Sequence, residues 1–165
     1  MMTRRNTWMG LLAAAAGVRG LFAAWPGHAA QATAREVEHT DAEWNKLLTP
    51  AQYDVLRHGG TEPPFSSPLD KEKRAGVFSC AGCNQRLFSS KTKFDSGTGW
   101  PSFYAPLSKG VVDEQSDFTL GMKRTEVLCH RCGSHLGHVF DDGPKPTGLR
   151  YCMNGLALKF TPDSA

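Results

Sequence analysis

The chain has 165 residues, of which 40% are hydrophobic and 21% are charged, a composition typical of a soluble globular domain with an additional segment. Its formal net charge of +3 comes from the N-terminus. Residues 1–32 hold three arginines and no acidic residue, and the remainder has 16 basic against 16 acidic side chains. This balance excludes a polybasic surface, so nucleic acid is not an expected partner.

Residues 1–32 have the features of a cleavable export signal. Arg4 and Arg5 precede an apolar stretch over 8–25, and 30–32 read Ala-Gln-Ala, a typical cleavage site. The arginine pair loosely resembles a twin-arginine signal, and the interrupted stretch is too short for a stable membrane span. We therefore expect an exported protein, periplasmic in a bacterium. An organellar transit peptide is one alternative, and an uncleaved tail on a cytosolic protein is another.

After a linker at 33–39, a domain is expected over residues 40–162, beginning with two short helices. Thr40-Asp41-Ala42-Glu43 forms a capping box at the start of the first helix. Thr49-Pro50 supplies an N-cap and a proline at the first position of the second helix, and Gly59-Gly60 ends it.

From Gly76 onward the helical periodicity disappears and short strands are predicted instead. Clusters of Gly, Pro, Asp and Ser separate the apolar runs, which is typical of turns between strands. The pattern predicts a mainly β domain built from antiparallel sheets. The predicted strands are 77–79, 86–88, 118–120, 126–128, 149–153 and 157–160.

Four of the five cysteines form two C-x-x-C pairs, which is the ligand spacing of a closed zinc site. Four thiolates leave no open coordination position, so we expect one structural rather than catalytic Zn²⁺. Two disulfides are the alternative, since an exported protein could form them. The predicted ligands are Cys80, Cys83, Cys129 and Cys132.

The fifth cysteine, Cys152, stands alone. In a strand, Arg150, Cys152 and Asn154 project from one face. The guanidinium is expected to favour the thiolate and lower the pKa of Cys152, and Asn154 could bind a polar substrate oxygen. The alternative is a buried structural cysteine, which the polar neighbours argue against.

Two histidines and two aromatic residues complete the candidate site. His135 and His138 face opposite sides of a regular strand. Either a bulge at Gly137 therefore brings both to one site, or only one of them is functional. Trp100 and Phe103, in a glycine-rich loop, could form the wall of an apolar pocket for a methyl or thioether group, with core packing as the alternative.

Together with the C-x-x-C pairs, five segments of the chain resemble the B-type methionine sulfoxide reductases, which are peptide-methionine (R)-S-oxide reductases. The resemblance extends from about residue 44 to residue 160. The segments that carry it are 61–65, 93–97, 99–103, 135–140 and 148–152.

The resemblance implies two antiparallel β-sheets in an Mss4-like or β-tent fold, one structural zinc, and a catalytic cysteine at Cys152. It implies reduction of peptidyl methionine (R)-sulfoxide through a Cys152 sulfenic acid, with repair of oxidised proteins as the role. Thioredoxin or another external thiol is the implied reductant, and we expect a monomer. The implied surroundings of the substrate are Trp100 at its methyl group, and His135, His138 and Asn154 at its oxygen, with Arg150 nearby.

One departure from this family concerns position 98. Many members carry a resolving cysteine where this chain has Thr98, and the chain has no sixth cysteine. Recycling of Cys152 is therefore expected to depend on an external thiol. Two other functions remain open: a non-catalytic zinc-stabilised binding or chaperone module, and a cysteine hydrolase that uses Cys152 and a histidine.

Overall fold

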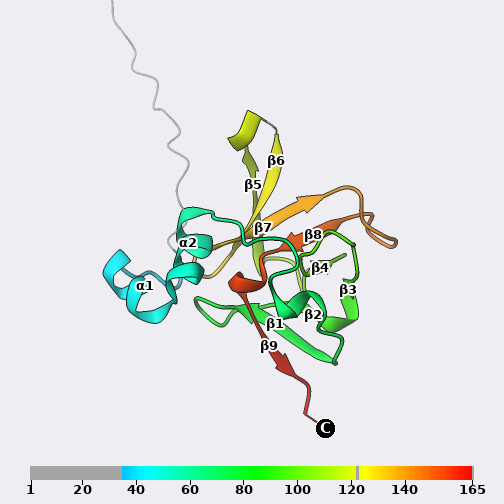
Figure 1. Cartoon of the computed structure of the whole chain (residues 1–165), viewed down its shortest axis with the longest axis horizontal. Helices are drawn as coiled ribbons and strands as arrows, with labels where there is room; N and C mark the ends of the chain where they lie inside the picture. The colour runs from blue at the N-terminus through cyan, green and yellow to red at the C-terminus, as the bar shows by residue number, and fades with distance from the viewer. Residues whose placement is uncertain (1–34, 122, 165) are drawn as a thin grey trace, which may run out of the picture. The chain divides into compact units, whose positions relative to one another are not determined.

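The structure is a computed structural model that describes residues 35–121 and 123–164 (Figure 1). The expected export signal at 1–32 lies outside these residues, as do the first two positions of the expected linker. The described residues belong to one compact unit. None of the helices within it has the length and apolar character needed to cross a bilayer.

Both predicted helices and their caps are present, as α1 (Asp41–Leu47) and α2 (Pro50–His58). Thr40 and Glu43 form the expected capping box, and Thr49 forms a second one with Gln52. Gly59 ends α2 in the left-handed conformation, with φ of 70°, which costs glycine little because it has no Cβ. In Figure 1 the two helices lie to one side of the sheets, and α2 packs on strand β7.

The remainder forms two sheets, whose strand pairs within the described residues are all antiparallel, so the predicted mainly β fold is confirmed. The smaller sheet has the order β2-β1-β9 and consists of β1 (Gly76–Cys80), β2 (Arg86–Ser89) and β9 (Leu158–Pro162). The larger sheet has the order β3-β4-β8-β7-β6-β5. Its strands are β3 (Lys93–Phe94), β4 (Ser102–Phe103), β5 (Val112–Asp117), β6 (Arg124–Cys129), β7 (His135–Phe140) and β8 (Arg150–Met153).

The strand predicted at 118–120 is wrong. The strand in this region is β5, which ends at Asp117, and residues Thr119–Gly121 form the 3-10 turn η3 at the tip of the β5–β6 hairpin. The apolar residues near Phe118 suggested a strand, but the side chain of Phe118 is exposed. The strand itself is mostly polar, because β5 is an edge strand with a largely solvated face.

An aromatic core joins the two sheets. Phe78 of β1 and Phe88 of β2 pack on Phe103 of β4, with ring centroids 5.0 and 4.5 Å apart. All three side chains are fully buried, and burial of one such ring contributes about 2–3 kcal/mol to folding. The core therefore fixes the larger sheet, which carries Cys152, against the smaller one.

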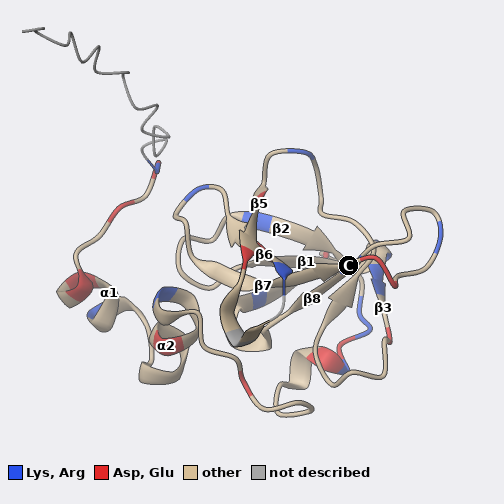
Figure 2. Ribbon diagram, turned by 90° about the horizontal axis from the view of Figure 1, so that it is seen from above, with Lys and Arg blue, Asp and Glu red and all other residues tan. Residues whose placement is uncertain are grey.

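Lysine and arginine segments alternate with aspartate and glutamate segments over the ribbon in Figure 2. Several of these charges form pairs between distant segments, including Arg35 with Asp113 and Arg131 with Glu36. The charges of the described residues are thus interspersed, as the sequence composition predicts.

Candidate active site and metal centre

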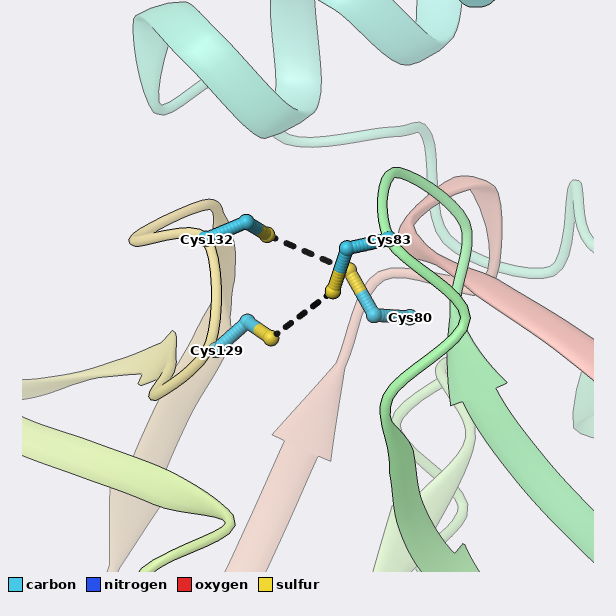
Figure 3. A group of neighbouring side chains, drawn as sticks. All are labelled: Cys80, Cys83, Cys129 and Cys132. Carbon is cyan, nitrogen blue, oxygen red and sulfur yellow. Dashed lines mark hydrogen bonds between the residues drawn. The ribbon is translucent and has the colours of Figure 1, made fainter. Parts of the chain in front are cut away.

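The four C-x-x-C cysteines meet at one buried point (Figure 3). Cys80 and Cys83 come from the end of β1 and the turn before β2, and Cys129 and Cys132 come from the end of β6 and the turn before β7. The four Sγ atoms all lie within 4.8 Å of one another. Figure 3 shows the two turns facing each other, one from each sheet.

The local backbone explains how each turn directs its two thiols inward. The residue after the second cysteine of each pair has a left-handed conformation: φ is 60° at Asn84 and 69° at Gly133. Glycine and asparagine tolerate this conformation better than other residues do. The N–H groups of Asn84 and Gly133 donate to the carbonyls of Cys80 and Cys129, at 2.9 and 2.8 Å, and close both turns.

The sulfur geometry fits a tetrahedral metal ion. Four sulfurs bound at the zinc–sulfur distance of about 2.3 Å lie about 3.8 Å from one another in a tetrahedron. The observed Sγ–Sγ distances are 3.8 Å between Cys80 and Cys132 and 3.5 Å between Cys83 and Cys129. A disulfide needs about 2.05 Å, and all four cysteines are free. An ion held here would connect the smaller sheet to the larger one.

Cys152 lies in β8, in the middle of the larger sheet. Its register partners are Ser102 in β4 and His138 in β7. Directly opposite residues in an antiparallel pair share a face of the sheet, so a hydroxyl and an imidazole flank the thiol. As the sequence predicts, Tyr151 and Met153 are buried in the core, whereas Cys152 between them is only half-buried.

A cavity of about 140 Å³ opens beside the Cys152 thiol. A larger cavity of about 680 Å³ lies over the segment before β1, but neither a cysteine nor a histidine lines it. The smaller cavity is therefore the candidate reaction site, because it combines a nucleophile, an imidazole and an indole in a confined space. Its wall includes Thr61, Trp100, Arg124, His138, Cys152 and Asn154.

Burial raises the pKa of the Cys152 thiol. Thr98, Arg150 and Ser102 act in the opposite direction, but burial is the larger effect. The expected fall in this pKa is therefore wrong. Arg150 does lower the pKa of Cys152, as expected. Its guanidinium, however, also donates two hydrogen bonds to the Asp142 carboxylate, at 2.8 and 2.7 Å.

A chain of hydroxyl groups ends at the Cys152 sulfur. Thr98 Oγ1 lies 3.8 Å from Cys152 Sγ and 2.8 Å from Ser96 Oγ. Ser96 Oγ in turn lies 2.7 Å from Ser102 Oγ, whose hydroxyl donates to the Trp100 carbonyl at 3.0 Å. Threonine 98 therefore occupies the side of the thiol where a cysteine could reach it.

β7 contains the bulge that one of the two sequence-based alternatives requires, and it brings the two imidazoles next to each other, but only His138 lines the cavity. Val127 pairs with Gly137 and Leu128 pairs with His135, so Leu136 has no partner in β6. The imidazole centroids of His135 and His138 are 5.4 Å apart. Gly137 has φ of 155°, and a side chain there would collide with the Cys152 carbonyl.

The two imidazoles nevertheless have different surroundings. His138 lines the cavity, and its Nε2 lies 2.8 Å from Asp117 Oδ2. His135 is almost fully buried outside the cavity wall, with its Nδ1 2.6 Å from Glu126 Oε1 and its Nε2 without a hydrogen-bond partner.

Asp117 and Arg124 belong to this site although the sequence did not indicate either residue. Arg124 Nη2 lies 2.6 Å from Asp117 Oδ2, so the carboxylate bridges a guanidinium and the His138 imidazole. Burial lowers the pKa of His138, and the hydrogen bond to Asp117 partly offsets that effect. The incorrect strand at 118–120 concealed Asp117, and only the strand register brings it to a histidine 21 residues away.

Two further predicted residues have surroundings that the sequence did not indicate. Phe103 is wrong as a pocket wall, because Ser102 and Phe103 face opposite sides of β4 and the phenyl ring lies in the core. Asn154 does line the cavity, but its carboxamide is already bound. Its Oδ1 accepts from the Glu62 N–H at 3.1 Å, and its Nδ2 donates to the Leu136 carbonyl at 3.3 Å.

Comparison with known proteins adds independent findings. The family model described as SelR domain matches residues 48–162. A protein of Leptospira interrogans named peptide methionine sulfoxide reductase MsrB is 58% identical over 125 residues, which covers 76% of this chain and 95% of the relative. Proteins with the same name from Methanosarcina barkeri and Agrobacterium fabrum are 58% and 52% identical. These alignments cover 76% and 79% of this chain, and 89% and 96% of the relatives.

Proposed function

The chain belongs to the SelR-domain family of MsrB peptide methionine sulfoxide reductases, and we propose that its reaction takes place at Cys152 in the 140 Å³ cavity. The enzyme is a peptide-methionine (R)-S-oxide reductase. The observation that supports the assignment of the site is that Cys152 lines this cavity together with its register partner His138 and with Trp100.

The reaction begins when the Cys152 thiolate attacks the sulfoxide sulfur. This attack forms a bond between Cys152 Sγ and the substrate sulfur, and the sulfoxide oxygen takes a proton. Transfer of the resulting hydroxyl to Sγ then breaks the S–O bond and the new Sγ–S bond, and methionine is released. In the net reaction the oxygen is transferred to Cys152: the substrate sulfur gains two electrons, the cysteine sulfur loses two, and Cys152 becomes a sulfenic acid. Burial raises the pKa of Cys152, and Thr98, Arg150 and Ser102 act in the opposite direction, so these three residues are the proposed stabilisers of the attacking thiolate.

His138 is the proposed proton donor. It lines the cavity, whereas His135 does not. Asp117 engages Nε2, so Nδ1 is the nitrogen left to reach the sulfoxide oxygen. The Asp117 carboxylate favours the protonated imidazole that such an acid requires. Trp100 is the proposed contact of the substrate methyl group. Asn154 lines the same cavity and is the proposed polar neighbour of the oxygen, whereas Arg150 and His135 do not line it.

We assign one structural zinc ion to the four cysteines. The sulfur distances and the all-thiolate ligand set support zinc, and four ligands leave no position for substrate. The ion would hold the β1–β2 turn against the β6–β7 turn, so it acts on the fold and takes no part in the transfer of oxygen. Metal analysis of the purified enzyme is expected to give one zinc per chain.

An external thiol completes the cycle. Attack by a thiolate on the Cys152 sulfenic acid releases water and forms a mixed disulfide, which a second thiol then reduces. Thioredoxin or a thioredoxin-like protein is the proposed donor of these thiols. Oxidised proteins are the proposed substrates, and the enzyme is proposed to act as a monomer. The threonine 3.8 Å from the sulfur supports this route, because it cannot form a disulfide.

Residues 1–32 support export to the bacterial periplasm. The protein recovered from a periplasmic fraction is expected to begin near residue 33. If the protein is recovered only from the cytosol, with residues 1–32 still attached, export is contradicted but the proposed reaction is not.

The decisive experiment for the activity is chiral analysis of a peptide that contains racemic methionine sulfoxide. With excess dithiothreitol as reductant, the R epimer is expected to be consumed and the S epimer to remain. Absence of reduction would favour a binding module, and cleavage of the peptide would favour a hydrolase. Equal consumption of both epimers would contradict the stereochemical assignment.

A further inference from the structure

Glu62 is a buried acidic residue in the segment 61–67, which precedes the 3-10 turn η1 (Pro68–Asp70). Only 3% of Glu62 is exposed. Its carboxylate accepts two backbone hydrogen bonds, from the N–H of Gly155 at 2.6 Å and from the N–H of Leu156 at 2.8 Å. A buried carboxylate is tolerated when such charge-assisted bonds replace its hydration.

The two N–H donors belong to the chain immediately after the reactive cysteine. Gly155 begins the 3-10 turn η4 (Gly155–Ala157), which follows β8 and the cavity residue Asn154. The Glu62 side chain therefore ties the segment 61–67 to the end of the strand that carries Cys152.

The backbone of Glu62 contacts two walls of the cavity. Its N–H donates to Asn154 Oδ1 at 3.1 Å, and its carbonyl accepts from Trp100 Nε1 at 3.1 Å. Trp100 and Asn154 come from two separate segments, just before β4 and just after β8. Thr61, the neighbour of Glu62, lines the same cavity. One residue thus connects three parts of the cavity wall.

The segment 61–67 also approaches the Trp100 loop closely at a second point. The Phe65 N–H donates to the Gly99 carbonyl at 2.7 Å. A Cβ at Gly99 would lie 2.9 Å from Pro64 Cβ, closer than real side chains approach. Phe65 itself has φ of 63°, an uncommon conformation for an aromatic residue. Such strain persists where the surrounding contacts hold the backbone in place.

We propose that Glu62 is a positioning residue of the reductase: its carboxylate holds the segment 61–67 so that Trp100 and Asn154 meet the S-alkyl group and the oxygen of the sulfoxide in one fixed arrangement. The inference rests on the proposed site at Cys152. It assigns to Glu62 control of the width of the methyl pocket, and therefore of the choice between S-methyl and larger S-alkyl sulfoxides.

The carboxylate is required because both of its partners are donors. In Glu62→Gln one carbonyl oxygen remains, and the new NH₂ group faces a backbone N–H that has lost its acceptor. The loss frees the segment while the side-chain volume stays almost unchanged. The Trp100 indole can then move away from Cys152, which widens the pocket but leaves the thiol and its hydroxyl neighbours in place.

The test compares the R epimers of N-acetylmethionine sulfoxide and N-acetylethionine sulfoxide, which differ by one methylene at sulfur. In Glu62→Gln the KM for the methionine compound is expected to rise about tenfold. The preference for the S-methyl over the S-ethyl compound is expected to fall about fivefold or more. One methylene in a fitted pocket changes kcat/KM by about 10–200-fold, so a looser pocket should lose part of this discrimination. The rate of Cys152 alkylation by iodoacetamide is expected to change less than about twofold, because the thiol environment is retained.

Glu72→Gln is the matched control. Glu72 is another carboxylate of this region, with hydrogen bonds to Arg74, and it contacts neither Trp100 nor Asn154. It is expected to keep both the wild-type KM and the wild-type S-methyl preference. Glu62→Asp, which retains the charge but is one methylene shorter, is the second variant and is expected to shift both quantities in the same direction as Glu62→Gln.

A Glu62→Gln variant that loses thermal stability but keeps the wild-type KM and S-methyl preference would overturn the proposal and leave Glu62 a structural residue only. Unfolding of both Glu62 variants at the assay temperature would have the same meaning. Failure of the wild type to reduce either sulfoxide would instead contradict the proposed function, so the two failures are distinguishable.

Discussion

The four-cysteine cluster and Cys152 place the same side chain in two different settings. In the cluster each sulfur faces other sulfurs, and the site lies between the two sheets. Cys152 faces hydroxyl groups and an imidazole, lies within one sheet and opens to a cavity. The difference shows that the neighbours, and not the residue type, determine whether a thiol meets only other thiols or lies among polar side chains beside a cavity.

The two sites also differ in what compensates for a negative charge on sulfur. Four crowded thiolates repel one another and need a cation between them. The single thiolate at Cys152 has only partial compensation, from Arg150 and two hydroxyls, against the effect of burial. A stably bound ion is therefore expected at the four-cysteine cluster. At Cys152 a nucleophile is expected whose thiolate forms as the pH rises.

The largest effect is expected from breaking the cluster. Serine at any one of its four positions removes a thiolate ligand. The variant should lose zinc and unfold much more readily, since structural zinc sites contribute on the order of 10 kcal/mol in small modules. Metal content and thermal unfolding of the purified variants test this prediction. A wild-type enzyme that folds without zinc, with its four cysteines paired as disulfides, would refute it.

Cys152→Ser should affect the chemistry and not the fold. A hydroxyl neither forms a sulfenic acid nor ionises near neutral pH, so turnover of the R epimer should be abolished. The zinc content and thermal stability should remain those of the wild type, which is the opposite of the outcome for the cluster. Substantial turnover by this variant would show that the nucleophile has been misassigned.

Asp117→Asn tests the proton donor. Asp117 raises the pKa of His138 against the effect of burial, so removal of the charge should lower that pKa further. An acid must be protonated to act, and the alkaline limb of kcat/KM should therefore move to lower pH, with a loss of about ten- to a hundredfold at neutral pH.

Asp113→Asn is the matched control for this measurement. Asp113 lies on the same strand and also contacts a histidine and an arginine, His130 and Arg35, but away from Cys152. Its pH profile should match that of the wild type, provided that the zinc content is unchanged. Identical profiles for Asp117→Asn and the wild type would exclude His138 as the acid controlled by Asp117.

The smallest effect concerns the reduction of oxidised Cys152 back to the thiol. It tests whether the four cluster cysteines take any part in that reduction. After one turnover without reductant, wild-type Cys152 should persist as a sulfenic acid that dimedone traps. In Thr98→Cys a sulfur replaces the hydroxyl that lies 3.8 Å from Cys152 Sγ, so an internal disulfide should form and thioredoxin should reduce it several-fold faster, as expected for dithiol exchange.

Mass spectrometry distinguishes these products directly. A disulfide from wild-type Cys152 to one of the four cluster cysteines would mean that the metal site is also a redox partner. The division between structural and catalytic sulfur would then not hold.

The sequence by itself determined the features that depend on neighbouring residues in the chain. Thr40 and Thr49 indicated both helix starts because a capping residue lies within one turn of the groups that it caps. The two C-x-x-C pairs indicated the four cysteines that cluster, and the alternation around Cys152 indicated which of its neighbours are buried. The motifs that resemble the MsrB reductases indicated the family, and the comparisons confirmed it.

Only the tertiary structure decided which distant residues meet at the thiol. Asp117 reaches His138 through the register of β5, β6 and β7, and Glu62 reaches Asn154 across 92 positions of the chain. Phe103 turns into the core while its neighbour Ser102 faces Cys152. The direction of the Cys152 pKa shift likewise depends on burial. Sequence periodicity gives the face of a strand on which a residue lies, but strand pairing and packing determine what that face meets.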